Sequence, residues 1–282
     1  MSDFKSVYKD RINIVDNYMK TCFEKNFKCE PELYSAMEYA VFGNGKRLRS
    51  VLCIETARML TGDVERALPF AAAIEFIHAF SLVHDDLPCM DNDDMRRGLP
   101  SCHKKYGEAL ALLAGDALLN TAYELMAAEC EKSGIGAIRA MRHIAKSSGI
   151  HGMINGQVRD IKLSESKNAN EDRLIELIEQ KTMALIMTGI ISAAYLSDAD
   201  EKTVSLLEEF AYNLGIAFQI RDDFEDETED LQENHDSPNF INVLGRDAAM
   251  ERMKYHKEKA AKILSGFNNN EFISGLVTFL FN

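Results

Sequence analysis

The stretch from Asp85 to Gly98 (DDLPCMDNDDMRRG) places five aspartates beside two adjacent arginines. Carboxylates crowded this closely repel one another and favour a hard divalent cation with oxygen ligands. Guanidinium groups suit phosphate oxygens, because their forked donors can bind two oxygens at once. Carboxylates, a divalent metal and arginines in one place predict a site that handles a diphosphate. The alternative for this stretch alone is an acidic, solvated turn.

A second acidic cluster, RDDFED, contains Asp222 and Asp226 and begins 137 positions after Asp85. Asp222 and Asp226 are four residues apart, so on a helix they share a face about 6 Å apart along the axis. Asp85 and Asp91 are six residues apart, which on a straight helix would leave them about 240° from each other. Pro88 should break the helix, so that Asp91 can return to the side of Asp85. We expect the two clusters to face each other across a cavity.

The elements that must position these clusters are helices. The chain has 282 residues, 46% hydrophobic and 27% charged, which is typical of a globular protein with a large core. The segment 67–84 is apolar on nearly all sides, so it should lie at the centre of the protein and end at Asp85 and Asp86. Helical periodicity predicts further helices at 4–23, 31–42, 51–60, 107–131, 135–150, 171–196, 202–226, 239–265 and 271–281. The prediction is one all-α domain over residues 1–282, with no linker or internal repeat.

Composition also limits the partners and the compartment. The net charge of −13 argues against binding to nucleic acid or to an anionic membrane. The six cysteines show no CxxC pair and no zinc spacing, which favours reduced thiols and a cytosolic compartment. The first 18 residues lack the apolar core of a signal peptide. The most apolar window, 183–196, is too short for a membrane span, so we expect a cytoplasmic protein without one.

As a set, the motifs of this chain resemble those of the trans-isoprenyl diphosphate (polyprenyl) synthases, among them the bacterial farnesyl diphosphate synthases. The resemblance covers nearly the whole chain. It rests on GNGKRLR (43–49), FIHAFSLVHDDLPCMDNDDMRRG (76–98), CHKKYGEALALLAGDALL (102–119), GQVRD (156–160), KT (181–182) and GIAFQIRDDFED (215–226). It implies the isoprenoid synthase fold, a bundle of about ten or more helices around a central cavity, and a homodimer with an interface near 107–131.

The resemblance also implies a role for individual residues. The diphosphate of isopentenyl diphosphate is expected at Gly45, Lys46, Arg49, His78 and Arg97. The GNGK sequence is not a Walker loop, because no Ser or Thr follows the lysine. A lone histidine on an apolar helix, such as His78, is otherwise a satisfied core residue.

The allylic substrate and the metal are assigned in the same way. The resemblance assigns the allylic diphosphate and its ionisation to Arg96, Lys181 and Thr182, and stabilisation of the carbocation to Gln219. It implies Mg²⁺, about three ions with substrate bound. The residues expected to bind the metal are Asp85, Asp91, Asp222, Asp86 and Asp226. Gln157 and Asp160 are expected either beside Lys181 or in ordinary contacts between helices.

The implied reaction condenses isopentenyl diphosphate with dimethylallyl or geranyl diphosphate. Phe80 lies five residues before Asp85, about 7.5 Å back along the helix. The resemblance implies that Phe80, with Ser81, closes the floor of the cavity and favours the fifteen-carbon product, farnesyl diphosphate. Plain core packing is the alternative for Phe80, and a synthase of the twenty-carbon geranylgeranyl diphosphate is the alternative function.

The segment after the second cluster departs from the resemblance. Residues 222–236 contain nine acidic residues and no lysine or arginine, and Glu225 replaces an apolar residue of the motif. Ser237, Pro238 and Asn239 stand where the family carries a lysine and hydroxyl residues. This departure keeps open a catalytically weak subunit that binds prenyl diphosphates and regulates another synthase. A metal phosphohydrolase reading of the HDD sequence lacks further histidine ligands, and a terpene cyclase would not need the GNGKRLR site.

Overall fold

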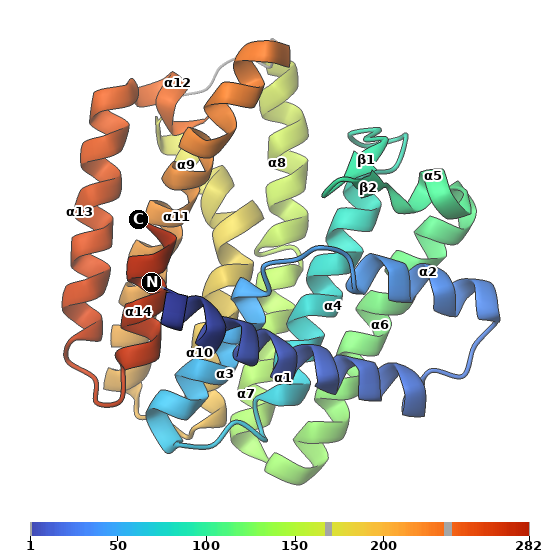
Figure 1. Cartoon of the computed structure of the whole chain (residues 1–282), viewed down its shortest axis with the longest axis horizontal. Helices are drawn as coiled ribbons and strands as arrows, with labels where there is room; N and C mark the ends of the chain where they lie inside the picture. Colours follow the sequence, from blue (N-terminus) through green and yellow to red (C-terminus); the bar gives the residue numbers. More distant parts are fainter. Residues whose placement is uncertain (1, 167–170, 234–238, 282) are drawn as a thin grey trace.

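The computed structural model describes residues 2–166, 171–233 and 239–281, and it is almost entirely helical (Figure 1). In chain order the elements are α1 (Ser2–Asn26), α2 (Pro31–Val41), α3 (Leu48–Thr61), α4 (Leu68–Asp85), β1 (Met95–Arg96), β2 (Leu99–Pro100), α5 (Cys102–Tyr106), α6 (Glu108–Ser133), α7 (Ile135–Ser148), α8 (Met153–Ser166), α9 (Glu171–Ile178), the π-helix η1 (Glu179–Met183), α10 (Ala184–Leu196), α11 (Glu201–Glu233), α12 (Phe240–Leu244), α13 (Arg246–Leu264) and α14 (Glu271–Leu280). Within these ranges, no helix combines the length and the apolarity that crossing a membrane requires.

Helix α4 lies in the middle of the molecule, as its apolar sequence predicts (Figure 1). Every residue from Leu68 to Ile77 is buried, and the helix packs against α1, α3, α6 and α10. Pro69 fits the first turn, where no backbone donor is needed. The rigid, buried body of α4 therefore fixes the place where Asp85 and Asp86 leave the helix.

Helices α10 and α11 form the other side of the candidate site. Almost all of α10 is buried against α3, α7 and α11, so the apolar window at 183–196 is a core helix. Helix α11 continues to Glu233, beyond the predicted end at 226, and packs along α13. It carries Asp222, whose negative charge acts on the buried guanidinium of Arg49 in α3.

The all-α prediction is confirmed, although several boundaries differ. The predicted helix 171–196 contains the π-helix η1, and the predicted helix 239–265 divides at Gly245, whose φ of +83° cannot continue a helix. Helices α5 and α8 were not predicted. The short hairpin β1–β2 was not predicted either; its turn at Arg97 and Gly98 has φ of +55° and +79°, the left-handed values that a two-residue hairpin turn requires.

Candidate active site

The first aspartate motif forms a loop that turns back on the end of α4. The helix ends at Asp85, and the backbone N–H of Asp91 donates to the Asp85 carbonyl at 2.9 Å. The N–H of Asn92 donates to the Leu87 carbonyl at 3.1 Å, which closes the same loop. The helix break predicted at Pro88 is confirmed, and it returns Asp91 to the neighbourhood of Asp85.

The environment of the Asp85 carboxyl is both partly buried and highly charged. Burial, helped by the negative charge of the nearby Asp91, raises its pKa to about 6, while the positive charge of Lys181 acts in the opposite direction. Gln157 of α8 donates a hydrogen bond to the Asp85 carboxylate. An acid that is difficult to ionise alone is stabilised in its charged form by a cation, so Asp85 suits a metal ligand.

Lys181 lies in the π-helix, and its ammonium group is paired with Asp160 of α8. A Cβ at Gly156 would lie 2.5 Å from the Lys181 backbone nitrogen, so glycine permits α8 to approach this closely. The expectation that Asp160 lies beside Lys181 is met, whereas the bond of Gln157 goes to Asp85 instead. Gly156, the glycine of GQVRD, could have indicated this close contact from the sequence, but it was not used to predict one.

A second group of side chains gathers positive charge around His78 of α4. Arg49 and Arg97 donate to His78 Nε2 at 3.4 Å and 3.2 Å. Burial and the surrounding arginines, Arg49 first, hold the pKa of His78 well below its ordinary value, so the imidazole is neutral and can accept. Two guanidinium groups that converge on one neutral acceptor form a site with excess positive charge, which attracts an anion.

The basic loop that carries Lys46 is held by residues that sequence reasoning did not single out. Arg47 has a left-handed backbone, with φ of +49°, and is 7% exposed. Its guanidinium is paired with Asp16 at 2.9 Å and with the buried Glu75 of α4 at 3.3 Å. The Tyr8 hydroxyl donates to the Lys46 carbonyl. The Lys46 ammonium itself remains largely exposed.

Gly45 adjoins the same arginines. A Cβ at this position would lie 3.0 Å from Arg97 Nη1 and 3.1 Å from Arg47 Nη1, closer than neighbouring groups normally approach a Cβ. The glycine therefore lets the backbone of the basic loop approach the β1–β2 hairpin. The structure thus brings together Gly45, Arg49, His78 and Arg97, four of the five residues expected around isopentenyl diphosphate.

Arg96 and Asp86 are engaged with each other. Arg96 donates to the Asp86 carboxylate through Nε at 2.9 Å and also through Nη2, and Asp93 accepts from the same guanidinium at 3.0 Å. Asp86 is 2% exposed. This pair attaches the hairpin to the end of α4. The expected roles of Asp86 at the metal and of Arg96 at the allylic diphosphate stay predictions.

The second aspartate motif has its own positive partners. Arg221 binds Asp222 at 2.5 Å, contacts Glu225 at 3.3 Å and donates to the Leu280 carbonyl at the end of α14. Burial raises the pKa of Asp222, whereas Arg221 and Lys46 act in the opposite direction. The Lys46 ammonium approaches Glu225 to 3.9 Å. The basic loop therefore reaches the second motif.

Gln219 donates to Asp223 at 2.9 Å, and the other Asp223 oxygen accepts the backbone N–H of Phe240. Asp223 therefore connects α11 to the start of α12. The side chains of Thr182 and Asp226 lie outside the described residues, as do the structures of Ser237 and Pro238. Of the remaining predicted residues, Phe80 is buried, and Ser81 donates to the His78 carbonyl of its own helix.

The carboxylates suit Mg²⁺ that is shared with a substrate. Within 2–166, 171–233 and 239–281, no three His, Cys, Asp or Glu side chains form a ready-made metal cage. Mg²⁺ is commonly held by one or two carboxylates together with substrate phosphates. Asp85 and Asp91 after α4, and Asp222 on α11, are carboxylates that fit that type of binding.

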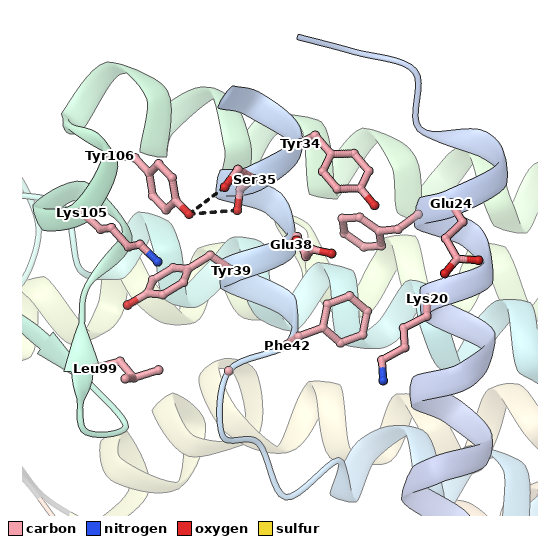
Figure 2. Close-up of a pocket in the computed structure, with 12 residues that line it drawn as sticks. Lys20, Glu24, Tyr34, Ser35, Glu38, Tyr39, Phe42, Leu99, Lys105 and Tyr106 are labelled. Atoms are coloured by element: carbon pink, nitrogen blue, oxygen red, sulfur yellow. Dashed lines mark hydrogen bonds between the residues drawn. The ribbon is translucent and has the colours of Figure 1, made fainter. Parts of the chain in front are cut away.

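Figure 2 shows a separate cavity of about 530 Å³ that is lined by residues of α1, α2, β2 and α5. Lys105 lies 3.7 Å above the Tyr39 ring, and the Tyr106 hydroxyl is 3.0 Å from Ser35 Oγ. The cavity contains none of the predicted site residues. It shares only Tyr39, Gly43 and Leu99 with a narrow recess next to Asp86, Arg96 and Arg97. The candidate site is thus identified by converging charge and not by cavity size.

Comparisons with known proteins agree with this geometry. A sequence model described as polyprenyl synthetase matches residues 30–238. A farnesyl diphosphate synthase of Bacillus subtilis is 32% identical over 93% of this chain and 92% of its own length. A heterodimeric geranylgeranyl pyrophosphate synthase large subunit of Arabidopsis thaliana is 36% identical over 89% of this chain and 70% of its own. The crystal structure of an FPP/GFPP synthase from Zymomonas mobilis superimposes with a TM-score of 0.88 at 30% identity, covering 98% and 99% of the two chains.

Proposed function

This chain belongs to the polyprenyl synthetase family, and from that premise we propose that it is a short-chain prenyltransferase. The proposed reaction condenses isopentenyl diphosphate with dimethylallyl or geranyl diphosphate, and the proposed product is farnesyl diphosphate. One observation carries the proposal: carboxylates stand after the end of α4 and on α11, and beside them Arg49 and Arg97 converge on a neutral histidine.

Different residues of the chain bind the two substrates. Lys46, Arg49 and Arg97 bind the diphosphate of isopentenyl diphosphate, and the incoming phosphate oxygens replace His78 as the acceptor of the arginine donors. Asp85, Asp91 and Asp222 hold Mg²⁺, which when bound withdraws charge from the allylic diphosphate and assists loss of that group.

Lys181 acts next to the allylic diphosphate. Its ammonium already neighbours Asp85 and Asp91, so it stabilises negative charge that develops on the departing diphosphate. The double bond of isopentenyl diphosphate attacks the allylic cation, and Gln219 orients its amide towards the resulting charge. A proton then leaves, and the released diphosphate accepts it. No protein nucleophile is required.

Product length is the finer part of the proposal. Phe80, buried one and a half turns before the end of α4, supports the fifteen-carbon product because its ring fills space that a longer chain would need. The alternative is geranylgeranyl diphosphate, the product named for several plant relatives. Residues 30–238 match the family, and we propose that residues 1–282 act as a single synthase domain.

We also propose that two copies form a homodimer in the cytoplasm. The helices α6 to α8 carry several exposed large apolar side chains: Leu112, Leu113, Ile135, Ile138, Ile154, Val158 and Ile161. Exposed apolar area of this kind is typical of an interface. All six cysteines are unpaired, which is consistent with a reducing compartment. The alternative of a weakly active regulatory subunit predicts association with a different chain.

One incubation tests the activity. The purified chain alone is supplied with radiolabelled isopentenyl diphosphate and either allylic substrate, with and without Mg²⁺, and the extracted products are sized. Mg²⁺-dependent formation of the fifteen-carbon diphosphate is expected. Twenty-carbon product would establish the alternative product, and absence of turnover would favour the regulatory subunit.

A further inference from the structure

His84 lies directly before the aspartate motif and joins α4 to α6, which lie side by side (Figure 1). Its ring meets the Phe80 ring edge to face, with centroids 5.3 Å apart and an interplanar angle of 88°. Its Nε2 donates to the main-chain carbonyl of Leu112 at 3.0 Å, and the Asp116 carboxylate is 3.9 Å away. The ring is therefore fixed between a helix backbone and the side chain of Phe80.

Gly115 of α6 provides the space for this ring. A Cβ at this position would lie 2.1 Å from His84 Nε2 and 2.3 Å from Cδ2, distances that no side chain tolerates. A glycine inside a helix is unfavourable relative to alanine. Its presence in the middle of α6 is explained by the imidazole that occupies the place of the missing side chain.

We propose that His84 is a positioning residue that sets product length by holding Phe80 across the floor of the prenyl cavity. The inference rests on the proposed function and deepens it. Phe80 can open space for a longer chain only if its ring turns away, and that rotation would give up the edge-to-face contact with His84. The His84 ring is held in place by its hydrogen bond to the Leu112 backbone carbonyl. It therefore does not move aside when the Phe80 ring turns, and the contact restrains Phe80.

The test measures the ratio of twenty-carbon to fifteen-carbon product. His84→Ala is expected to raise this ratio about tenfold, the size expected from losing one aromatic edge contact. Gly115→Ala should have the same effect, because the new methyl group displaces the imidazole. His143→Ala is the matched control: His143, like His84, is a half-buried histidine with its ring edge on an aromatic side chain, here Tyr195, and it does not contact Phe80.

A double-variant cycle separates positioning from general damage to the fold. If His84 acts through Phe80, then Phe80→Ala with His84→Ala gives the same product distribution as Phe80→Ala alone. A lower melting temperature with an unchanged product ratio in both His84→Ala and Gly115→Ala would overturn the inference. The inference would also be overturned if the double variant made longer products than Phe80→Ala alone, by as much as His84→Ala lengthens them by itself. A wild-type chain that forms no prenyl diphosphate would instead overturn the proposed function.

Discussion

Replacing Glu75 by glutamine should weaken both the fold and the binding of isopentenyl diphosphate. The Glu75 carboxylate is 4% exposed and accepts from Arg47 Nη1 and from the Ser50 backbone N–H, both at 3.3 Å. Arg47 lies between Lys46 and Arg49 in the chain, the two residues proposed to hold the diphosphate. The substitution keeps the side-chain shape, removes the charge and replaces one acceptor oxygen by an NH2 donor.

The expected loss of stability follows from the two hydrogen bonds. A bond to a charged group contributes about 1.5–3 kcal/mol and a neutral one about 0.5–1.5 kcal/mol, so two weakened bonds cost roughly 2–3 kcal/mol. The full cost of a buried charge without a partner is about 3–5 kcal/mol. Glu75→Gln should remain below that cost because Asp16 still pairs with Arg47 at 2.9 Å.

The functional effect should appear in KM. The diphosphate proposed to lie at Lys46 and Arg49 does not react, so a displaced loop would weaken binding in the ground state and in the transition state alike. We expect KM for isopentenyl diphosphate to rise about tenfold, which corresponds to about 1.4 kcal/mol, with kcat little changed. Urea unfolding gives the stability change, and initial rates at varied isopentenyl diphosphate give KM.

Glu55→Gln is the matched control. Glu55, like Glu75, is a buried carboxylate with two partners, in this case Arg11 at 2.8 Å and Arg58 at 3.0 Å. It lies further along α3 from the basic loop. It should lose a similar amount of stability and leave KM unchanged. If Glu75→Gln raises KM no more than Glu55→Gln does, the proposed support of the diphosphate site by Glu75 is refuted.

Three further predictions concern chemistry, pH and product length. Lys181→Gln should lower kcat by about 10²–10³-fold in single-turnover measurements, whereas Arg159→Gln, at a surface ion pair of the neighbouring α8, should retain wild-type rates. Burial lowers the pKa of His143 and of His256 to about 4, so the unfolded chain binds more protons below pH 6.5. The wild-type chain should thus lose roughly 1–3 kcal/mol more free energy of unfolding between pH 7 and pH 5 than a variant with both His143→Gln and His256→Gln. His78 and Asp85 titrate in both chains alike, so equal losses would contradict this assignment. Phe80→Ala should extend the product beyond fifteen carbons, and a product set that stays at fifteen would exclude Phe80 as the floor.

The parts of the fold that the sequence predicted depend on local patterns. An all-apolar segment must be central, and Pro88 must interrupt a helix, so the position of α4 and the return of Asp91 to Asp85 could both be anticipated. Predicted helices differ from the observed ones mainly at their ends, where propensity is weak and tertiary contacts decide the boundary.

The parts that were missed depend on contacts between distant segments. Nothing in the apolar pattern of 171–196 marks the π-helix, because one additional residue per turn leaves composition unchanged. The neighbouring sequence also does not predict the left-handed backbone of Arg47 or the pairing of Asp86 with Arg96. Arg47, Asp86 and Arg96 are charged residues within motifs, so the sequence suggests that they bind a ligand. Only the packed structure shows that each has a partner within the protein.

The same distinction bears on the second half of the site, where the chain departs from its relatives. The sequence 222–236 has no lysine or arginine, which leaves the acidic cluster without an obvious counter-charge. In the structure the counter-charge comes from outside that segment: Arg221 binds Asp222, and Lys46 approaches Glu225. Arg221 is fixed by the Leu280 carbonyl of α14, so the C-terminal helix helps to orient Asp222. Both cations oppose the rise in the pKa of Asp222 that burial causes, and this favours the ionised form that a metal requires. A lysine after the motif is therefore not the only way to keep Asp222 charged, and the departure at Ser237 does not by itself argue for an inactive subunit.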